Sequence, residues 1–117
     1  MRSGFVTREE YAFARHRELE CAMNIAGVPL ERCSSLGYTD QEAIYHLDEL
    51  CARLSEEFAR LLPDIVLTQP YEGGHPDHDA TAFAVDRCFD WSGQVLEMAS
   101  YHSRDGELVT GEFRVCR

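Results

Sequence analysis

The stretch PDIVLTQPYEGGHPDHDATAFAV, residues 63–85, joins an apolar run, a glycine pair and a histidine-rich loop to a helical pattern. The run at 64–68 is short, β-branched and nearly all apolar, which predicts a strand covered on both faces, as in a parallel sheet. From about His78 to Trp91 the apolar residues recur at helical spacing. The residues expected to face inward are Ala82, Val85, Cys88 and Phe89. The stretch therefore predicts the strand, loop and helix of an α/β fold.

The residues before this stretch carry two helix-start signals. Residues 7–10 read T-x-x-E, the form of a capping box, and Gly27 is a suitable C-terminal stop, which predicts a first helix between them. Residues 32–36 are expected to form a short extended strand. A second capping box at 39–42 predicts another helix, ended by Pro63. Its expected apolar stripe is Ile44, Leu47, Cys51, Leu54, Phe58 and Leu61.

The last quarter of the chain changes from helical to extended patterns. Two runs, 95–103 and 107–115, flank Arg104-Asp105-Gly106, which indicates a turn. The overall order is helix, short strand, helix, strand, helix and two strands. This order predicts an α/β fold: a Rossmann-like three-layer sandwich with a mainly parallel sheet and a C-terminal edge hairpin. At 117 residues the chain is expected to form a single domain, residues 1–117.

Composition and charge narrow the classes of partner. Hydrophobic residues make up 44% and charged residues 27%, which is typical of a globular protein. A formal net charge of -10 argues against binding to nucleic acid or to anionic membrane, because their phosphates would be repelled. The apolar runs are too short for membrane insertion, and the N-terminus lacks the apolar core of a signal peptide.

Five cysteines occur singly, without a C-x-x-C pair: Cys21, Cys33, Cys51, Cys88 and Cys116. An odd number without short spacings predicts reduced thiols in a cytoplasmic protein. Cys21, Cys51 and Cys88 fall within helical patterns, so we expect them to be small core residues rather than catalytic thiols.

The segment H-P-D-H, residues 75–78, follows the predicted strand at 64–68 and lies where α/β sheets bind ligands. Gly73 and Gly74 would let the backbone turn sharply and approach a substrate closely. A neutral imidazole binds Zn²⁺ well, and a carboxylate can fix its tautomer. Two interpretations of this segment stay open. One is metal or acid–base chemistry, and the other is a capping loop in which Asp77 or Asp79 accepts from helix N–H groups.

The strand and H-P-D-H segment resemble the second signature of the PIG-L/LmbE-type (GlcNAc-PI de-N-acetylase-like) family, metal-dependent deacetylases of N-acetylglucosaminyl compounds. ARHRELECAMNIAGV (14–28) and LGYTDQEA (36–43) are similar to the middle region of that family. The resemblance covers roughly residues 15–90. It implies that His78 is a ligand of Zn²⁺ or another divalent metal. It also implies that His75 stabilises the tetrahedral oxyanion or protonates the leaving amine, with Asp77 orienting His75 by hydrogen bonding.

The resemblance also implies a site that this sequence does not complete. The family takes its remaining metal ligands and its general base from an H-P-D-D-E motif, whereas here His-Pro-Asp occurs once and no Asp-Asp pair occurs. The resemblance therefore implies a partial domain, truncated at the N-terminus, with one identifiable ligand where catalytic zinc usually has three.

Other polar and aromatic residues are weaker site candidates. Glu72 and Asp79 are alternatives as weak ligands, because both are near His78 in sequence. His102 is expected to be structural, with a place at the mouth of a site as its alternative. The residues expected on the surface are His16 and His46, and those expected to pack are Tyr38 and Trp91.

Two function hypotheses follow. The first is zinc-dependent hydrolysis of the acetamide of an N-acetylglucosaminyl derivative, as part of a larger or split enzyme. The alternative is a catalytically inactive truncated homologue that acts as a binding or assembly module. A metal site shared by His78 of two chains is a third possibility. Missing strands would expose a sheet edge, so we expect self-association or a partner segment that completes the sheet.

Overall fold

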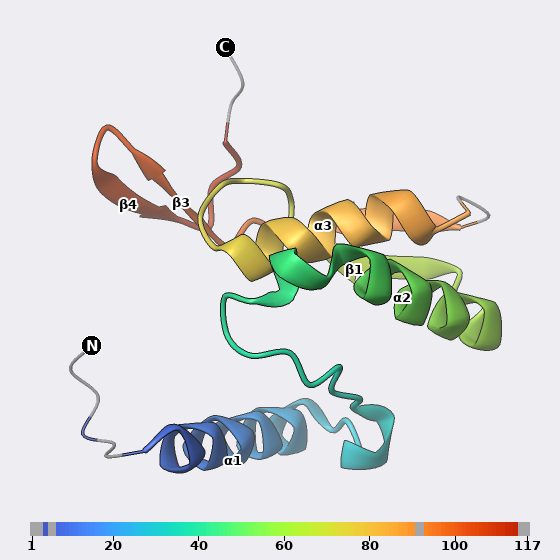
Figure 1. Cartoon of the computed structure of the whole chain (residues 1–117), viewed down its shortest axis with the longest axis horizontal. Helices are drawn as coiled ribbons and strands as arrows, with labels where there is room; N and C mark the ends of the chain where they lie inside the picture. Colours follow the sequence, from blue (N-terminus) through green and yellow to red (C-terminus); the bar gives the residue numbers. More distant parts are fainter. Residues whose placement is uncertain (1–3, 5–6, 91–92, 115–117) are drawn as a thin grey trace. The chain divides into compact units, whose positions relative to one another are not determined.

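The computed structural model describes residues 4, 7–90 and 93–114. The elements are α1 (Arg8–Ala26), η1 (Leu30–Arg32), η2 (Ala43–His46), α2 (Leu47–Leu61), β1 (Ile65–Thr68), α3 (Pro76–Cys88), β2 (Gln94–Glu97), β3 (Tyr101–Arg104) and β4 (Glu107–Thr110), where η denotes a 3₁₀ helix (Figure 1). They fall into two compact units, residues 1–36 and residues 37–117. Each unit is described by itself.

Helix α1 of the first unit begins and ends where the sequence predicts. The N–H of Glu10 donates to Thr7 Oγ1 at 3.1 Å, and the N–H of Thr7 donates to Glu10 Oε2 at 3.3 Å, which completes the capping box. Gly27 closes the helix with φ 68°. No described side chain of α1 is buried, so the prediction that Cys21 is a core residue is wrong.

The strand predicted at residues 32–36 is absent from the described structure. The chain forms the 3₁₀ turn η1 instead, because the N–H groups of Arg32 and Cys33 donate to the carbonyls of Pro29 and Leu30, three residues back. These local hydrogen bonds compete with strand pairing at the start of the segment.

Helix α2 begins later than predicted. The expected capping box at 39–42 does not form; the N–H of Glu42 donates to the backbone carbonyl of Thr39, and η2 precedes the helix. The end is close to the prediction, since Leu62 closes the helix with φ 46° just before Pro63. Leu50, which the predicted stripe omits, is the buried residue of α2, whereas Ile44 and Leu61 near the two ends are exposed.

Strands β1 and β2 form a parallel pair, with Ile65 opposite Gln94 and Thr68 opposite Glu97. Helix α3 makes the crossover between them and contacts both β1 and α2. Ile65 and Leu67 are 55% and 62% exposed, so the prediction that this strand is covered on both faces is wrong. The described residues cover one face only, and the other is an open apolar surface.

The two C-terminal runs divide differently from the prediction. The first run supplies β2, which pairs with β1, and also β3, which forms an antiparallel hairpin with β4. Asp105 and Gly106 have φ 54° and 85°, the pair of positive values of a type I′ turn, so the predicted turn is confirmed. The hairpin is a two-stranded sheet of its own rather than the edge of the parallel sheet.

The buried apolar residues gather on α3 and its neighbours. They are Ala43, Leu50, Ala80, Ala82, Ala84, Val85 and Phe89. The inward orientation predicted for Ala82, Val85 and Phe89 is confirmed, Cys88 is half-buried, and Trp91 lies outside the described residues. The mixed α/β class is confirmed as a small parallel sheet with helices and an antiparallel hairpin. No helix among the described residues combines the length and apolarity needed to cross a membrane.

The half-buried cysteines Cys51 on α2 and Cys88 on α3 are neighbours. Burial raises the pKa of the Cys51 thiol to about 11, and the hydrogen bond with Cys88 and the nearby Asp48 carboxylate act in the same direction. A thiol with this pKa is almost entirely protonated at neutral pH. It is therefore a poor nucleophile, in agreement with the structural role predicted for it. Cys116 lies outside the described residues.

Candidate active site

Helix α3 begins at the H-P-D-H segment, and the His75 side chain caps it. His75 has extended backbone, and its Nδ1 accepts a hydrogen bond from the N–H of Asp77 at 3.2 Å, with Pro76 in the first turn. Because Nδ1 is the acceptor, a neutral His75 carries its proton on Nε2. The capping interpretation placed this function on Asp77 or Asp79. The structure gives it to the histidine.

The Asp77 carboxylate instead holds the segment before α2. Its two oxygens accept from the N–H of Gln41 at 2.7 Å and from the N–H of Ala43 at 3.1 Å. This contact explains the late start of α2, since the N–H groups near the expected helix start are satisfied by a residue 34 or 36 positions away. The hydrogen bond between the Asp77 carboxylate and the His75 ring that the resemblance implies stays a prediction.

A carboxylate without a predicted role faces His75. Asp40 Oδ1 lies 3.6 Å from His75 Nε2, and the side chains are 64% and 21% exposed. Ligand atoms of Asp40, His75 and Asp77 all lie within 4.8 Å of one another, and no other such group of three or more occurs in the described part of the chain. The sequence signal for Asp40 was its position in the L-G-Y-T-D turn. The contact with His75 was not predictable, because nothing in the local pattern shows that this turn lies beside residue 75.

His78 lies on the first turn of α3, close to His75. Their ring centroids are 5.0 Å apart, and the ring of Tyr101 packs edge-on against His78 at 5.4 Å. Nδ1 of His78 is buried and has no hydrogen-bond partner among the described residues. An unpartnered imidazole nitrogen is a suitable donor for a divalent metal. His78 therefore fits the role of one ligand, but the three-residue group above does not include it.

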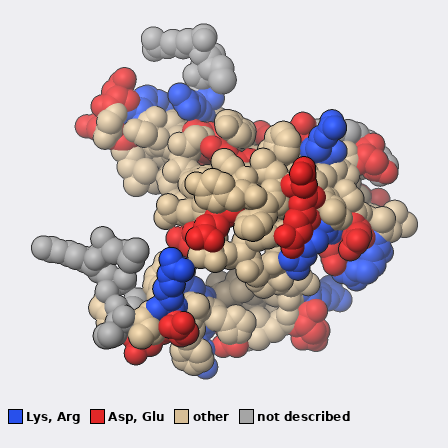
Figure 2. Space-filling model, viewed as in Figure 1, with Lys and Arg blue, Asp and Glu red and all other residues tan. Residues whose placement is uncertain are grey.

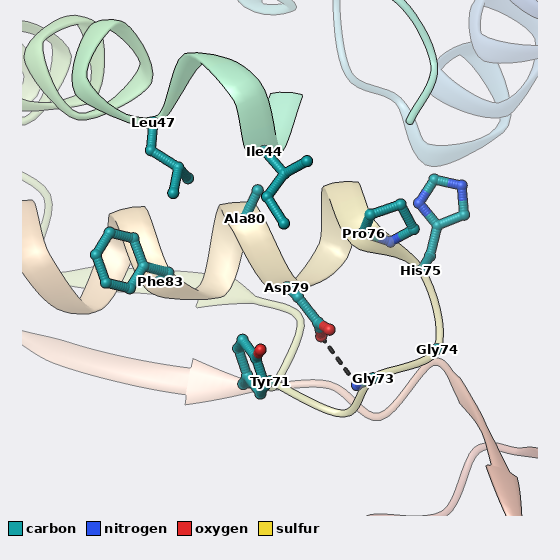
Figure 3. A pocket seen from close by; sticks show the side chains of 10 residues that line it. All are labelled: Ile44, Leu47, Tyr71, Gly73, Gly74, His75, Pro76, Asp79, Ala80 and Phe83. Atoms are coloured by element: carbon teal, nitrogen blue, oxygen red, sulfur yellow. Dashed lines mark hydrogen bonds between the residues drawn. The ribbon is translucent and has the colours of Figure 1, made fainter. Parts of the chain in front are cut away.

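Glu72 and Asp79, the alternative ligands, are both used in the loop itself. Asp79 Oδ1 accepts from the N–H groups of Glu72 and Gly73, each at 3.0 Å. Figure 3 shows the hydrogen bond to Gly73. Glu72 is 1% exposed and accepts from the N–H groups of Ser100 and Tyr101. Asp79 therefore holds the loop, and Glu72 holds the loop against the start of the hairpin. The expectation that either of them acts as a weak ligand stays a prediction.

A pocket of about 380 Å³ lies beside the H-P-D-H segment. Its apolar wall comes from η2, α2 and α3, while His75, Pro76 and the glycine pair form the opposite end (Figure 3). The apolar side chains are Ile44, Leu47, Ala80 and Phe83, with Tyr71 on the loop side. The volume is at the lower end of the range for small-molecule sites.

The remaining candidates have structural surroundings. His102 is 1% exposed, which confirms its structural role and excludes the mouth of the site. Tyr38 stacks on His46 with centroids 5.5 Å apart, as expected for a packing residue. His16 and His46 are both exposed, as predicted.

In the face shown in Figure 2, acidic and basic side chains are interspersed, and the described arginines of that view form no continuous basic patch. The expectation that nucleic acid is not a partner stays a prediction.

Comparison with known proteins gives one match. A family model described as PIG-L, GlcNAc-PI de-N-acetylase, matches residues 2–89. No curated protein and no solved structure matches the chain. The matched residues include α1, the L-G-Y-T-D turn, α2, β1, the H-P-D-H segment and all of α3. The chain that brings His75 and His78 together at the start of α3 belongs to the PIG-L family of GlcNAc-PI de-N-acetylases.

Proposed function

We propose that this chain supplies one wall of an N-deacetylase site that hydrolyses the acetamide of an N-acetylglucosaminyl derivative, as part of a larger or split enzyme. The observation that carries the proposal is the paired His75 and His78 imidazoles, 5.0 Å apart at the start of α3 and beside a pocket, in a chain of a deacetylase family. His78 would hold Zn²⁺ or another divalent ion, which when bound polarises the amide carbonyl and activates a water molecule.

The hydrogen bond to His75 favours one of its two predicted roles. With Nδ1 occupied by the N–H of Asp77, a neutral imidazole presents Nε2–H. A fixed N–H donor stabilises the oxyanion of a tetrahedral intermediate, because the donor is oriented before the charge develops. Protonation of the leaving amine would need a proton on both ring nitrogens and loss of the helix cap. We therefore assign His75 to the oxyanion, and the N–H of Asp77 to the orientation of its ring.

The incomplete set of metal ligands supports the alternative, an inactive binding or assembly module. The described residues do not gather three donors around His78, and the sequence has no H-P-D-D-E motif. Under the first proposal, another segment or chain must donate the missing ligands and base. Under the second, no such donation occurs and the H-P-D-H segment keeps only its structural contacts.

We also propose that the open face of the β1–β2 pair is covered by self-association or by a partner segment, which would extend the pair towards a three-layer sandwich. Exposed apolar residues on both strands support this, with Leu67 at 62% and Leu96 at 48%. The location proposed for the chain is the cytoplasm, on the basis of its unpaired cysteines.

Zinc binding distinguishes the proposals. Calorimetry on the metal-free chain would compare the wild type with His78→Ala and with His16→Ala, an exposed histidine of α1, as the control. We expect weak binding that His78→Ala abolishes and His16→Ala preserves. Adding a peptide or domain that carries H-P-D-D-E should then strengthen binding and give deacetylation of N-acetylglucosaminyl compounds. Binding that is insensitive to His78→Ala would contradict the enzyme proposal.

A further inference from the structure

Two buried titratable side chains lie behind the H-P-D-H segment and take no part in the proposed chemistry. Glu72, on the loop before α3, and His102, on β3, are each 1% exposed. Residues of these types are rarely buried without a specific partner, because removing their polar atoms from water is costly. Their contacts therefore indicate what they hold in place.

The Glu72 carboxylate binds the start of the hairpin. Its Oε1 accepts from the N–H of Ser100 at 3.1 Å and from the N–H of Tyr101 at 2.9 Å. Its Oε2 is buried and has no hydrogen-bond partner in the described part of the chain. A complementary group, His102 Nδ1, lies 3.9 Å from Oε2 and is also buried and without a partner there.

Donor and acceptor types determine how this pair is protonated. Arg104 Nη2 can only donate, and it lies 3.4 Å from His102 Nε2, so Nε2 is the acceptor. A neutral His102 must then carry its proton on Nδ1, which faces Glu72 Oε2. A small side-chain rotation that shortens the 3.9 Å gap satisfies both orphaned atoms with one hydrogen bond. That hydrogen bond would complete a continuous series from Arg104 through His102 and Glu72 to the backbone of Tyr101.

The backbone held by Glu72 carries the ring that contacts the proposed metal ligand. Tyr101 packs edge-on against His78, with centroids 5.4 Å apart. Its carbonyl oxygen also lies so close to Gly74 that a Cβ there would be only 1.8 Å away. Glu72 therefore holds the N–H of Tyr101, and Gly74 lies against its carbonyl. These two contacts together determine the direction of the Tyr101 ring.

We propose that the Glu72–His102 pair is a positioning element that holds Tyr101 against His78 and so orients the His78 imidazole for metal binding. The inference rests on the proposed function only in the role of His78 as a ligand. It assigns no contact with substrate to Glu72, His102 or Tyr101. It adds two positioning residues from β3, Tyr101 and His102, and both lie outside the family match.

Imidazole ¹⁵N NMR of the whole chain tests the first step without any metal. In the wild type at pH 7 we expect His102 in the Nδ1–H tautomer and a nuclear Overhauser effect between the His78 and Tyr101 rings. In Glu72→Gln the side-chain oxygen can still accept from Ser100 and Tyr101, but the other position becomes an NH₂ donor facing His102. His102 should then change to the Nε2–H tautomer. The contact between the His78 and Tyr101 rings should weaken, because a neutral amide oxygen accepts from the N–H groups of Ser100 and Tyr101 less strongly than a carboxylate does. Glu97→Gln, a change of the same type at an exposed residue of β2, should alter neither signal.

Zinc affinity tests the second step. Loss of an outer residue that orients a metal-binding histidine typically weakens binding about 10- to 100-fold, and we expect a loss in this range for Glu72→Gln but not for Glu97→Gln. A second variant, Tyr101→Leu, removes the ring and leaves the backbone N–H that Glu72 binds. It should lower zinc affinity while His102 keeps its Nδ1–H tautomer, which also provides the test if Glu72→Gln does not fold.

The outcomes separate this inference from the proposed function. An Nε2–H tautomer of His102 in the wild type overturns the inference, as does a His78–Tyr101 contact unchanged in Glu72→Gln. Zinc affinity unchanged in both Glu72→Gln and Tyr101→Leu overturns the link to metal binding. If wild-type His78 binds no zinc at all, the proposed function fails, while the tautomer and the ring contact still decide whether the pair positions His78.

Discussion

His75 Nδ1 accepts the backbone N–H of Asp77 at 3.2 Å, so the imidazole assigned to the oxyanion is also the N-terminal cap of α3. A cap holds the ring in one orientation and one tautomer. The same contact therefore contributes to the stability of α3 and to the preorganisation of the site. Changes at this residue should affect both properties, and the two effects can be separated by choice of substitution.

The His75 cap gives the first prediction. His75→Ala should lower the free energy of unfolding by about 1 kcal/mol, because the N–H of Asp77 loses its acceptor. His75→Asn, whose side chain can also cap a helix, should recover most of this loss without restoring an imidazole. Urea denaturation of the three chains provides the measurement. Equal stability of wild type and His75→Ala would show that the cap is not formed in solution.

The second prediction concerns the Asp77 carboxylate, which accepts from the N–H groups of Gln41 and Ala43. Asp77→Ala should cost about 1–3 kcal/mol, since it leaves a half-buried donor unsatisfied and frees the segment before α2. Asp40→Ala is the matched control, because Asp40 is 64% exposed and its removal should change stability by less than about 0.5 kcal/mol. Hydrogen exchange at Gln41 and Ala43 should accelerate in Asp77→Ala only, and slow exchange there in that variant would argue against the contact.

The third prediction follows from the close approach of two backbone segments. A Cβ on Gly74 would lie 1.8 Å from the carbonyl oxygen of Tyr101, and backbone cannot move away as easily as a side chain. Gly74→Ala should therefore destabilise the chain by at least about 2 kcal/mol, measured by thermal unfolding. Gly4→Ala, where a Cβ meets nothing within 4 Å, should leave the unfolding temperature unchanged. A Gly74→Ala chain as stable as the wild type would contradict the described path of residues 74 and 101.

Thiol reactivity provides the fourth prediction. Because burial and Cys88 raise the pKa of Cys51 to about 11, only a very small fraction of it is thiolate at pH 8. Cys21 is exposed on α1 and should react with a disulfide reagent much faster. Mass spectrometry after short exposure identifies the order of labelling. The rate at Cys51 should rise with pH up to about 11, and a plateau near pH 9 would indicate an ordinary thiol pKa there.

The fifth prediction tests the open sheet face. At tens of micromolar the chain should sediment as a dimer or larger species, and Leu67→Ser should shift it towards monomer. Leu108→Ser, at a leucine on β4 that is also exposed, is the control and should not change the distribution. A wild-type chain that remains monomeric at this concentration would contradict self-association and leave a partner segment as the means of covering the face.

Much of the fold was predictable because its signals are local. The capping box at Thr7, the stop at Gly27 and the turn at Asp105 and Gly106 involve residues within a few positions of one another, and the structure confirms all three. The apolar run of β1 and the helical spacing of α3 are also local patterns. The start of α2 was not predictable in this way, because its N–H groups are satisfied by Asp77.

The sequence by itself determined the family and the two histidines of the H-P-D-H segment, since both depend on the order of residues along the chain. Only the tertiary structure decided which backbone segment or ring each carboxylate contacts. Asp77 holds residues 41 and 43, Asp79 holds the glycine turn, Glu72 holds Tyr101, and Asp40 faces His75. The local sequence does not distinguish these carboxylates, because they all have the same chemical group. Their roles differ because folding brings different N–H groups and rings to each of them.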